Sequence, residues 1–212
     1  MKGNIEKLAV LMIIAAIAMF MSVGMASADH NNWKVTGEYA VTAGMSCLFT
    51  PFPPGFTNNA TPTAPAGSNS ITLQGIFTFN HDGTGRMDST GVAIFPPPAF
   101  PNTFPHASAF HFSFTFTYDV TDDNTITIDA DENSFQVTYD TGPGFPFTAD
   151  KYSLSGVVSG DHKTLTLGSP TTLIQTMTIH LPSPAPPVIM NMICNGSYVL
   201  TRLGPIERGG RF

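Results

Sequence analysis

One stretch decides the fold: residues 108–120, which read SAFHFSFTFTYDV. Apolar or aromatic residues occupy every even position from Phe110 to Val120, and His, Ser, Thr or Asp occupies each odd position between them. Successive side chains of a strand point to opposite faces of a sheet. The segment therefore predicts a strand whose Phe face packs into a core and whose other face meets water.

Seven further stretches alternate in the same way, although less regularly: Trp33–Thr42, Ser70–Asn80, Gly85–Phe95, Thr125–Asp140, Lys151–Ser159, Lys163–Leu181 and Asn191–Leu203. Within Thr125–Asp140 the apolar positions change from even to odd, which predicts a bulge or a turn between two strands. Lys163–Leu181 keeps one phase around Pro170, so we expect one long, bent strand there. After residue 29, apolar residues nowhere keep helical spacing for three turns, and the fold class is therefore all-β.

The connections between these stretches are of two kinds that alternate along the chain. Short polar turns occupy residues 81–84, 121–124 and 160–162, whereas long, Pro-rich segments occupy residues 43–69, 96–107, 141–150 and 182–190. Alternate connections of an up-and-down meander lie at the same end, so all the long loops should share one end. We predict an eight-stranded antiparallel up-and-down barrel; a β-sandwich is the alternative, because short strands with Pro-rich loops suit it too.

The two cysteines, Cys47 and Cys194, lie near the two ends of the predicted domain. Closing eight strands into a barrel places the first strand beside the last, so both cysteines should meet at the loop end. We expect them to form a disulfide that closes the barrel. At the opposite end, Trp33 and Arg202 should be structural neighbours, with the guanidinium stacked on the indole.

The first 28 residues predict a signal peptide. Lys2 and Lys7 give a basic start, residues 8–25 are almost wholly apolar, and Ala26-Ser27-Ala28 is a small-residue cleavage site. Residues 29–203 would then form a single barrel domain and residues 204–212 a C-terminal tail. The expected location is the periplasm or the extracellular space.

Charge and motif content exclude several classes of function. The net charge of −6 argues against a nucleic-acid partner, which requires a basic surface. The sequence contains no Gly-x-Ser-x-Gly element, no evident acid–base pair and no closely spaced His pair. We therefore predict no catalytic residues, no metal ligands and no cofactor, and a protein that is not an enzyme.

Phenylalanines in the Pro-rich loops are the unusual feature. Loops are normally polar, yet Phe52, Phe100, Phe104 and Phe145 lie in these segments. We interpret these four rings as the apolar rim of a binding site for a small hydrophobic or amphipathic ligand. Three alternatives stay open: rings that merely cap the core, a structural or adhesive module whose loops contact another protein, and an eight-stranded outer-membrane barrel.

The first and last strands resemble the calycins, the group of lipocalin-like and avidin-like barrels. That group has a Gly-x-Trp element in its first strand, and many lipocalins have a late Arg that packs on the Trp. Here Gly37-Glu38-Tyr39 has Tyr in the place of Trp, Arg202 comes late, and residues 159–167 look like a lipocalin-like hairpin. The resemblance implies an eight-stranded exported barrel and carries over no ligand-contacting residue.

Overall fold

A computed structural model gives the arrangement of the chain within the unit Asn31–Phe212. It describes residues 31–50, 55–63, 66–95, 107–140, 147–150, 152–169, 174–180, 184 and 186–204. These contain one short 3-10 helix, η1 (Asn32–Lys34), and eleven strands. The strands are β1 (Gly37–Thr50), β2 (Gly67–Phe79), β3 (Thr84–Ile94), β4 (Ala107–Val120), β5 (Thr125–Ala130), β6 (Gln136–Tyr139), β7 (Phe147–Ala149), β8 (Ser153–Val158), β9 (Thr164–Gly168), β10 (Gln175–Ile179) and β11 (Val188–Arg202).

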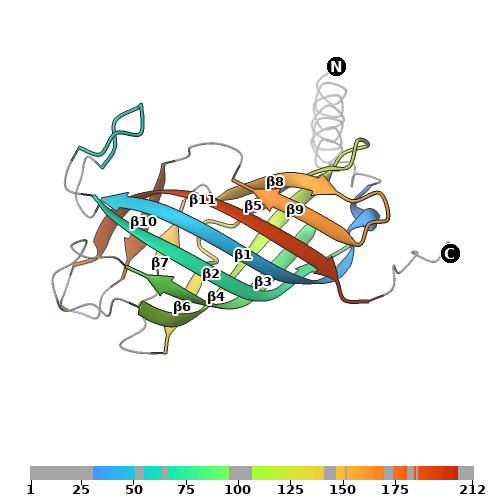
Figure 1. Ribbon diagram of the computed structural model, residues 1–212, viewed down its shortest axis with the longest axis horizontal. Helices are drawn as coiled ribbons and strands as arrows, with labels where there is room; N and C mark the ends of the chain where they lie inside the picture. Colours follow the sequence, from blue (N-terminus) through green and yellow to red (C-terminus); the bar gives the residue numbers. More distant parts are fainter. Residues whose placement is uncertain are drawn as a thin grey trace, which may run out of the picture. The chain divides into compact units, whose positions relative to one another are not determined.

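Eight of these strands form a closed antiparallel ring (Figure 1). The order is β1-β2-β3-β4-β5-β8-β9-β11, and β11 returns to β1 through a ladder from Tyr39↔Arg202 to Thr50↔Asn191. This confirms the predicted all-β, eight-stranded antiparallel fold. The short turns, at residues 80–83, 121–124 and 159–163, all lie at one end, which we call the hairpin end; the opposite end is the loop end.

The burial of β4 follows the alternation that its sequence shows. Phe114 and Phe116 are each only 1% exposed, whereas His111, Thr115 and Thr117 are exposed. The inward rings of β2 and β4 contact one another edge-on or tilted, with Phe77 5.5 Å from Phe116 between ring centroids. The apolar face therefore points into the barrel, as predicted.

The phase change in Thr125–Asp140 is a bulge opposite β4. β5 and β6 both pair with β4, and five residues, 131–135, lie opposite only two β4 residues, Phe114 and Thr115. Three extra residues are an odd number, so the inward positions change from even to odd. Ser134 holds the bulge to β4, because its hydroxyl accepts from the Thr115 N–H and donates to the Asp131 carbonyl.

Lys163–Leu181 likewise forms two strands on one partner. β9 and β10 both pair with β11: Gly168 lies opposite Ser197, and Gln175 lies opposite Met192. Between these two pairs the numbering advances by seven on one side and by five on the other, and this even difference keeps the inward phase the same in β9 and β10. The predicted single strand is thus two ladder segments on one path.

The ring is closed unevenly along its length. In the hairpin half, β5 pairs with β8 and β8 pairs with β9. In the loop half, β6 pairs with β4, β7 pairs with β10, and no backbone pairing joins β6 to β7 among the residues that the structure describes. This half therefore has a seam between two short strands, an arrangement that lies between a barrel and a sandwich.

The first strand differs from its prediction at both ends. Trp33 lies in η1, and β1 begins only at Gly37 and continues to Thr50. Cys47 is therefore inside the β1–β11 ladder, directly opposite Cys194, and not beyond the strand. The cysteines are bonded, which confirms the predicted disulfide.

Each hairpin turn contains one aspartate with the same function. Asp82, Asp123 and Asp161 accept hydrogen bonds from a Ser or Thr hydroxyl and from the backbone N–H two residues later. Hydrogen bonds to the charged form lower the pKa of all three carboxyls. These Asx-type turns explain why the hairpin end is compact.

Candidate functional site

The hairpin end is plugged by η1 and by Arg202. The Arg202 guanidinium donates to the carbonyls of Thr36 at 2.6 Å, Lys34 at 2.8 Å and His162 at 3.1 Å. It also lies 4.8 Å from the centroid of the Tyr39 ring. One side chain thus ties the last strand to η1, to the β8–β9 turn and to the first strand.

The predicted stacking of Arg202 on Trp33 is wrong, because Tyr39 is the ring beneath the guanidinium. Tyr39 is the direct ladder partner of Arg202 and points inward with it. Trp33 precedes the strand, is 39% exposed, and meets the His162 ring edge-on at 5.4 Å. Burial raises the pKa of Tyr39 to about 12, despite the nearby cation, and burial with the charges of Lys34 and Arg202 lowers the pKa of His162.

Replacing Arg202 with Leu should lower the free energy of unfolding by about 3 kcal/mol, because three carbonyls lose a charged donor at once. Urea titration of the purified protein measures this. Lys163→Leu is the matched control: this exposed cation lies in the neighbouring turn and should change stability by less than about 0.5 kcal/mol. Equal effects of both substitutions would contradict the plug.

The four ring residues of the predicted binding site are expected from the sequence at the loop end. Phe52, Phe100, Phe104 and Phe145 all lie outside the described residues. The described strands of the loop half carry inward-facing side chains, and these side chains form the candidate site.

Inward side chains of the two halves differ in exposure. In the hairpin half they form one continuous core in which Phe77, Phe114 and Leu154 are almost fully buried. In the loop half the inward residues form two smaller clusters, one around Phe49 and Met192 and the other around Phe110 and Val137. Partly exposed residues of these clusters and their surroundings include Met45, Ile71, Phe112, Tyr139, Met177 and Met190.

The disulfide lies in the wall of this half. Cys194, Cys47 and Asn69 form one row across β11, β1 and β2, because Cys47 is the ladder partner of both others. Asn69 has the inward phase of Ile71 and Leu73 and is 8% exposed. Its Oδ1 atom has no hydrogen-bond partner.

A second polar group lies deeper, between the two halves. The hydroxyls of Tyr152 and Tyr198 are hydrogen-bonded to each other, and the Tyr198 hydroxyl donates to the Met45 sulfur at 3.1 Å. Burial raises the pKa of Tyr198 to about 12 and that of Tyr152 well above its ordinary value. Both phenols therefore stay neutral, and they are satisfied by each other.

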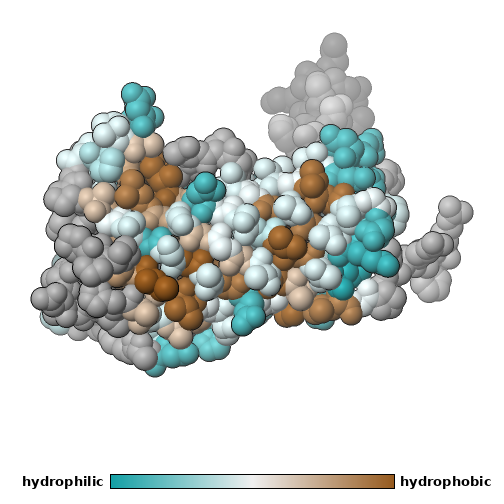
Figure 2. Space-filling view, viewed as in Figure 1, coloured by the Kyte–Doolittle hydropathy of each residue, from teal (hydrophilic) through white to brown (hydrophobic). Residues whose placement is uncertain are grey.

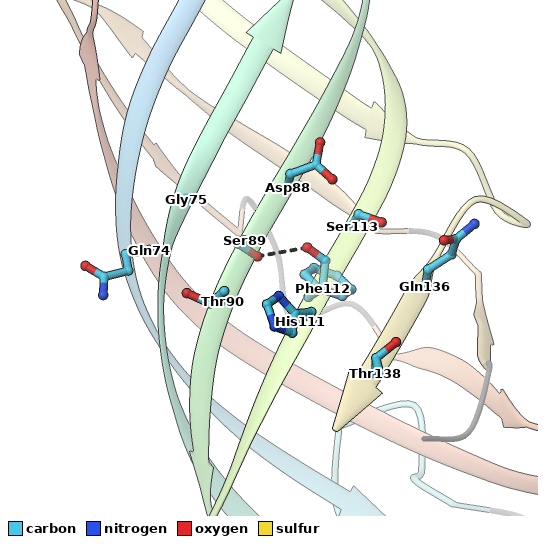
Figure 3. A pocket seen from close by; sticks show the side chains of 10 residues that line it. All are labelled: Gln74, Gly75, Asp88, Ser89, Thr90, His111, Phe112, Ser113, Gln136 and Thr138. Carbon is cyan, nitrogen blue, oxygen red and sulfur yellow. Dashed lines mark hydrogen bonds between the residues drawn. The ribbon is translucent and has the colours of Figure 1, made fainter. Parts of the chain in front are cut away.

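A third site is a polar groove of about 380 Å³ on the outer face of β2, β3, β4 and β6 (Figure 3). Its wall presents the side chains of Gln74, Asp88, Thr90, His111, Gln136 and Thr138. Beneath them, the hydroxyl of the buried Ser89 donates to the Phe112 carbonyl at 3.0 Å. His111 Nε2 lies 3.7 Å from an Asp140 carboxylate oxygen, an exposed ion pair that contributes little to stability when the imidazole is protonated.

Glycine permits the close strand approach next to this groove. A Cβ atom on Gly75 would lie 2.1 Å from the Asp88 carbonyl oxygen, so only glycine fits there. Gly156 is similar, with 1.9 Å to the Thr166 carbonyl oxygen. The inward glycines at these two places serve tight strand packing.

Sequence reasoning missed Asn69, and it placed Trp33 instead of Tyr39 beneath Arg202. Asn69 carried a usable signal, since an amide in phase with Ile71 and Leu73 should be inward. Among the described residues, no three His, Cys, Asp or Glu side chains are grouped closely enough to hold a metal ion. None of the helices described is long and apolar enough to cross a membrane.

The fold and these sites define an antiparallel, disulfide-closed β-barrel with a packed hairpin half and a looser loop half. The chain matches no protein-family model and no curated protein.

Proposed function

We propose that this protein is an exported, calycin-like barrel that binds a small apolar or amphipathic ligand at its loop end. One observation carries the proposal: the inward apolar side chains are sealed in the hairpin half but partly exposed in the loop half. An eight-stranded barrel has room for side chains alone or for one small ligand. Ligand sites are concave and mostly apolar with a few polar groups, a description that these walls match.

The outer face supports a barrel that faces water. A membrane-spanning barrel needs an outward apolar band about 25 Å tall. The outward residues of β4 are instead His111, Ser113, Thr115, Thr117 and Asp119. On the face in Figure 2, apolar residues form separate patches among residues of intermediate or low hydropathy.

The location that we propose is the periplasm or the extracellular space, after cleavage near Ala28. A disulfide between neighbouring strands persists in such oxidising compartments and fits this location. The calycin-like character is supported by the Arg202–Tyr39 contact, because it joins the late Arg to the Gly37-Glu38-Tyr39 element.

Nile red, a neutral apolar dye, should bind the mature protein with a blue-shifted emission. Ile71→Gln should weaken this binding about five- to tenfold, because it places an amide among the inward apolar side chains of the loop half. Ile94→Gln is the matched control: Ile94 is exposed on the outer face of β3, and its replacement should leave the affinity unchanged. Fluorescence titration measures all three proteins.

Absence of any blue shift with the unaltered protein would favour the second candidate, a structural or adhesive module. The polar groove supports that candidate, since its exposed amides, hydroxyls and imidazole can hydrogen-bond a partner protein.

A further inference from the structure

We propose that the ligand of the loop half is neutral and carries a hydrogen-bond donor, such as an alcohol or phenol on an apolar body, and that this donor binds Asn69 Oδ1. The inference rests on the proposed function, because it concerns the ligand of the same site. It adds the chemical class of that ligand and the residue that selects it.

The side-chain oxygen of Asn69 is buried without a hydrogen-bond partner. Nearly all buried polar side-chain atoms in proteins have a partner, so an orphaned acceptor needs an explanation. Asn69 is more than nine-tenths buried and its Oδ1 has none. A ligand that donates a hydrogen bond at this atom would remove the cost of leaving it unsatisfied.

Asn69 lies beside the apolar cluster of the loop half. Its ladder partner is Cys47, which belongs to the apolar cluster with Phe49 and Met192. The next inward residue of β2, Ile71, packs on the same cluster and is partly exposed. The orphaned oxygen therefore lies on the inward face, beside the residues that we propose as the apolar wall.

The described wall of the loop half is uncharged. The two apolar clusters of the loop half contain Met, Phe, Ile, Ala, Val, Tyr and disulfide side chains, and none of these described residues carries a charge. A ligand carboxylate or ammonium buried there would have no counter-charge, which is costly. The wall therefore favours a neutral molecule.

Methionines form part of the apolar wall of the loop half. Met177 and Met190 are direct ladder partners on β10 and β11, and both pack on the cluster that contains Met192. Unbranched thioether side chains adapt to irregular apolar shapes and offer no strong donor or acceptor. They suit the body of the ligand and leave its polar end to Asn69.

The test compares 2-naphthol with 2-methoxynaphthalene, which differ in the donor but share the ring, by displacement of Nile red from the unaltered mature protein. We expect 2-naphthol to bind about fivefold more tightly. Apolar burial alone predicts the reverse order, since the methyl ether is the more apolar compound. We expect 2-naphthoate, the anion, to bind more weakly than either.

Asn69→Leu should abolish the preference for 2-naphthol while the protein still binds Nile red. The matched control is Asn195→Leu, because Asn195 is exposed on β11 next to Cys194 and its replacement should keep the preference. Equal affinities of the two compounds for the unaltered protein, or a preference that survives Asn69→Leu, would overturn the inference alone. If the unaltered protein binds neither Nile red nor either naphthalene, the proposed function itself is overturned. If Asn69→Leu does not fold, the relative affinity of the unaltered protein for 2-naphthol and 2-methoxynaphthalene still tests the inference.

Discussion

Phe114→Asp should leave no folded protein in solution. Phe114 is almost fully buried, and its ring contacts the rings of Phe77, Phe135 and Tyr152 at centroid distances of 5.4–6.2 Å. Removing a buried Phe costs about 3–5 kcal/mol, and an unpaired carboxylate in an apolar core adds several more. The sum approaches or exceeds the whole stability of a typical domain, about 5–15 kcal/mol. Soluble yield and circular dichroism after export measure the outcome.

Thr72→Asp provides the control for this substitution. Thr72 is exposed on the outer face of β2, and its ladder partners are Gly44 and Val92, neither of which is charged. We expect a change in stability within about 0.5 kcal/mol. If Thr72→Asp failed to fold and Phe114→Asp folded in detergent, the inside and outside of the barrel would be reversed, as in a membrane barrel.

Most of the fold was predictable from the alternation of apolar and polar residues, and from whether the apolar positions are odd-numbered or even-numbered. A strand such as β4, with a ring at every second position, has one arrangement that buries all the rings. The phase change near Asp131 indicated a bulge or a turn, and the structure has three extra residues there. The constant phase around Pro170 indicated one bent strand, whereas the structure has two strands, β9 and β10, that pair with the same partner, β11. The disulfide followed from topology, because a closed meander places its first strand beside its last.

Features that depend on how segments meet in space could not be predicted. The seam between β6 and β7 depends on how two short strands with different partners meet in space, and no local sequence pattern records that. The ring beneath Arg202 depended on where β1 begins, and η1 moved Trp33 out of the ladder. The alternation of β1 continues past Thr42 to Thr50, but the Pro-rich stretch after it obscured this strand end.

For the candidate site, the sequence indicated only the half of the barrel in which we propose it. The Phe residues of the Pro-rich segments indicated the loop end, and the partly exposed inward residues lie in that half of the barrel. Asn69, which we propose as the polar group that selects the ligand, is the third residue of β2, and the predicted strand, Ser70–Asn80, began one residue after it. Its lack of a partner is a property of the packed structure and has no counterpart in sequence.

Loss of the disulfide should lower the free energy of unfolding by about 4–5 kcal/mol. The bond joins residues 147 apart, and in the chain-entropy model a covalent link of this span mainly restricts the unfolded chain. The folded ladder between β1 and β11 keeps its backbone pairing on both sides of Cys47. The double variant Cys47→Ala/Cys194→Ala should therefore fold to the same barrel but unfold at much lower urea concentration.

The urea slope tests the mechanism as well as the magnitude. Without the link the unfolded chain is less compact, so the dependence of the unfolding free energy on urea should become steeper. The unaltered protein, reduced while unfolded, should show the same slope and stability as the double variant. A loss below about 1 kcal/mol with an unchanged slope would show that the β1–β11 ladder, rather than the covalent link, determines barrel closure.

The same double variant also tests whether the disulfide shapes the proposed binding site, because Asn69 lies beside the bond. Nile red binding by the folded double variant measures this.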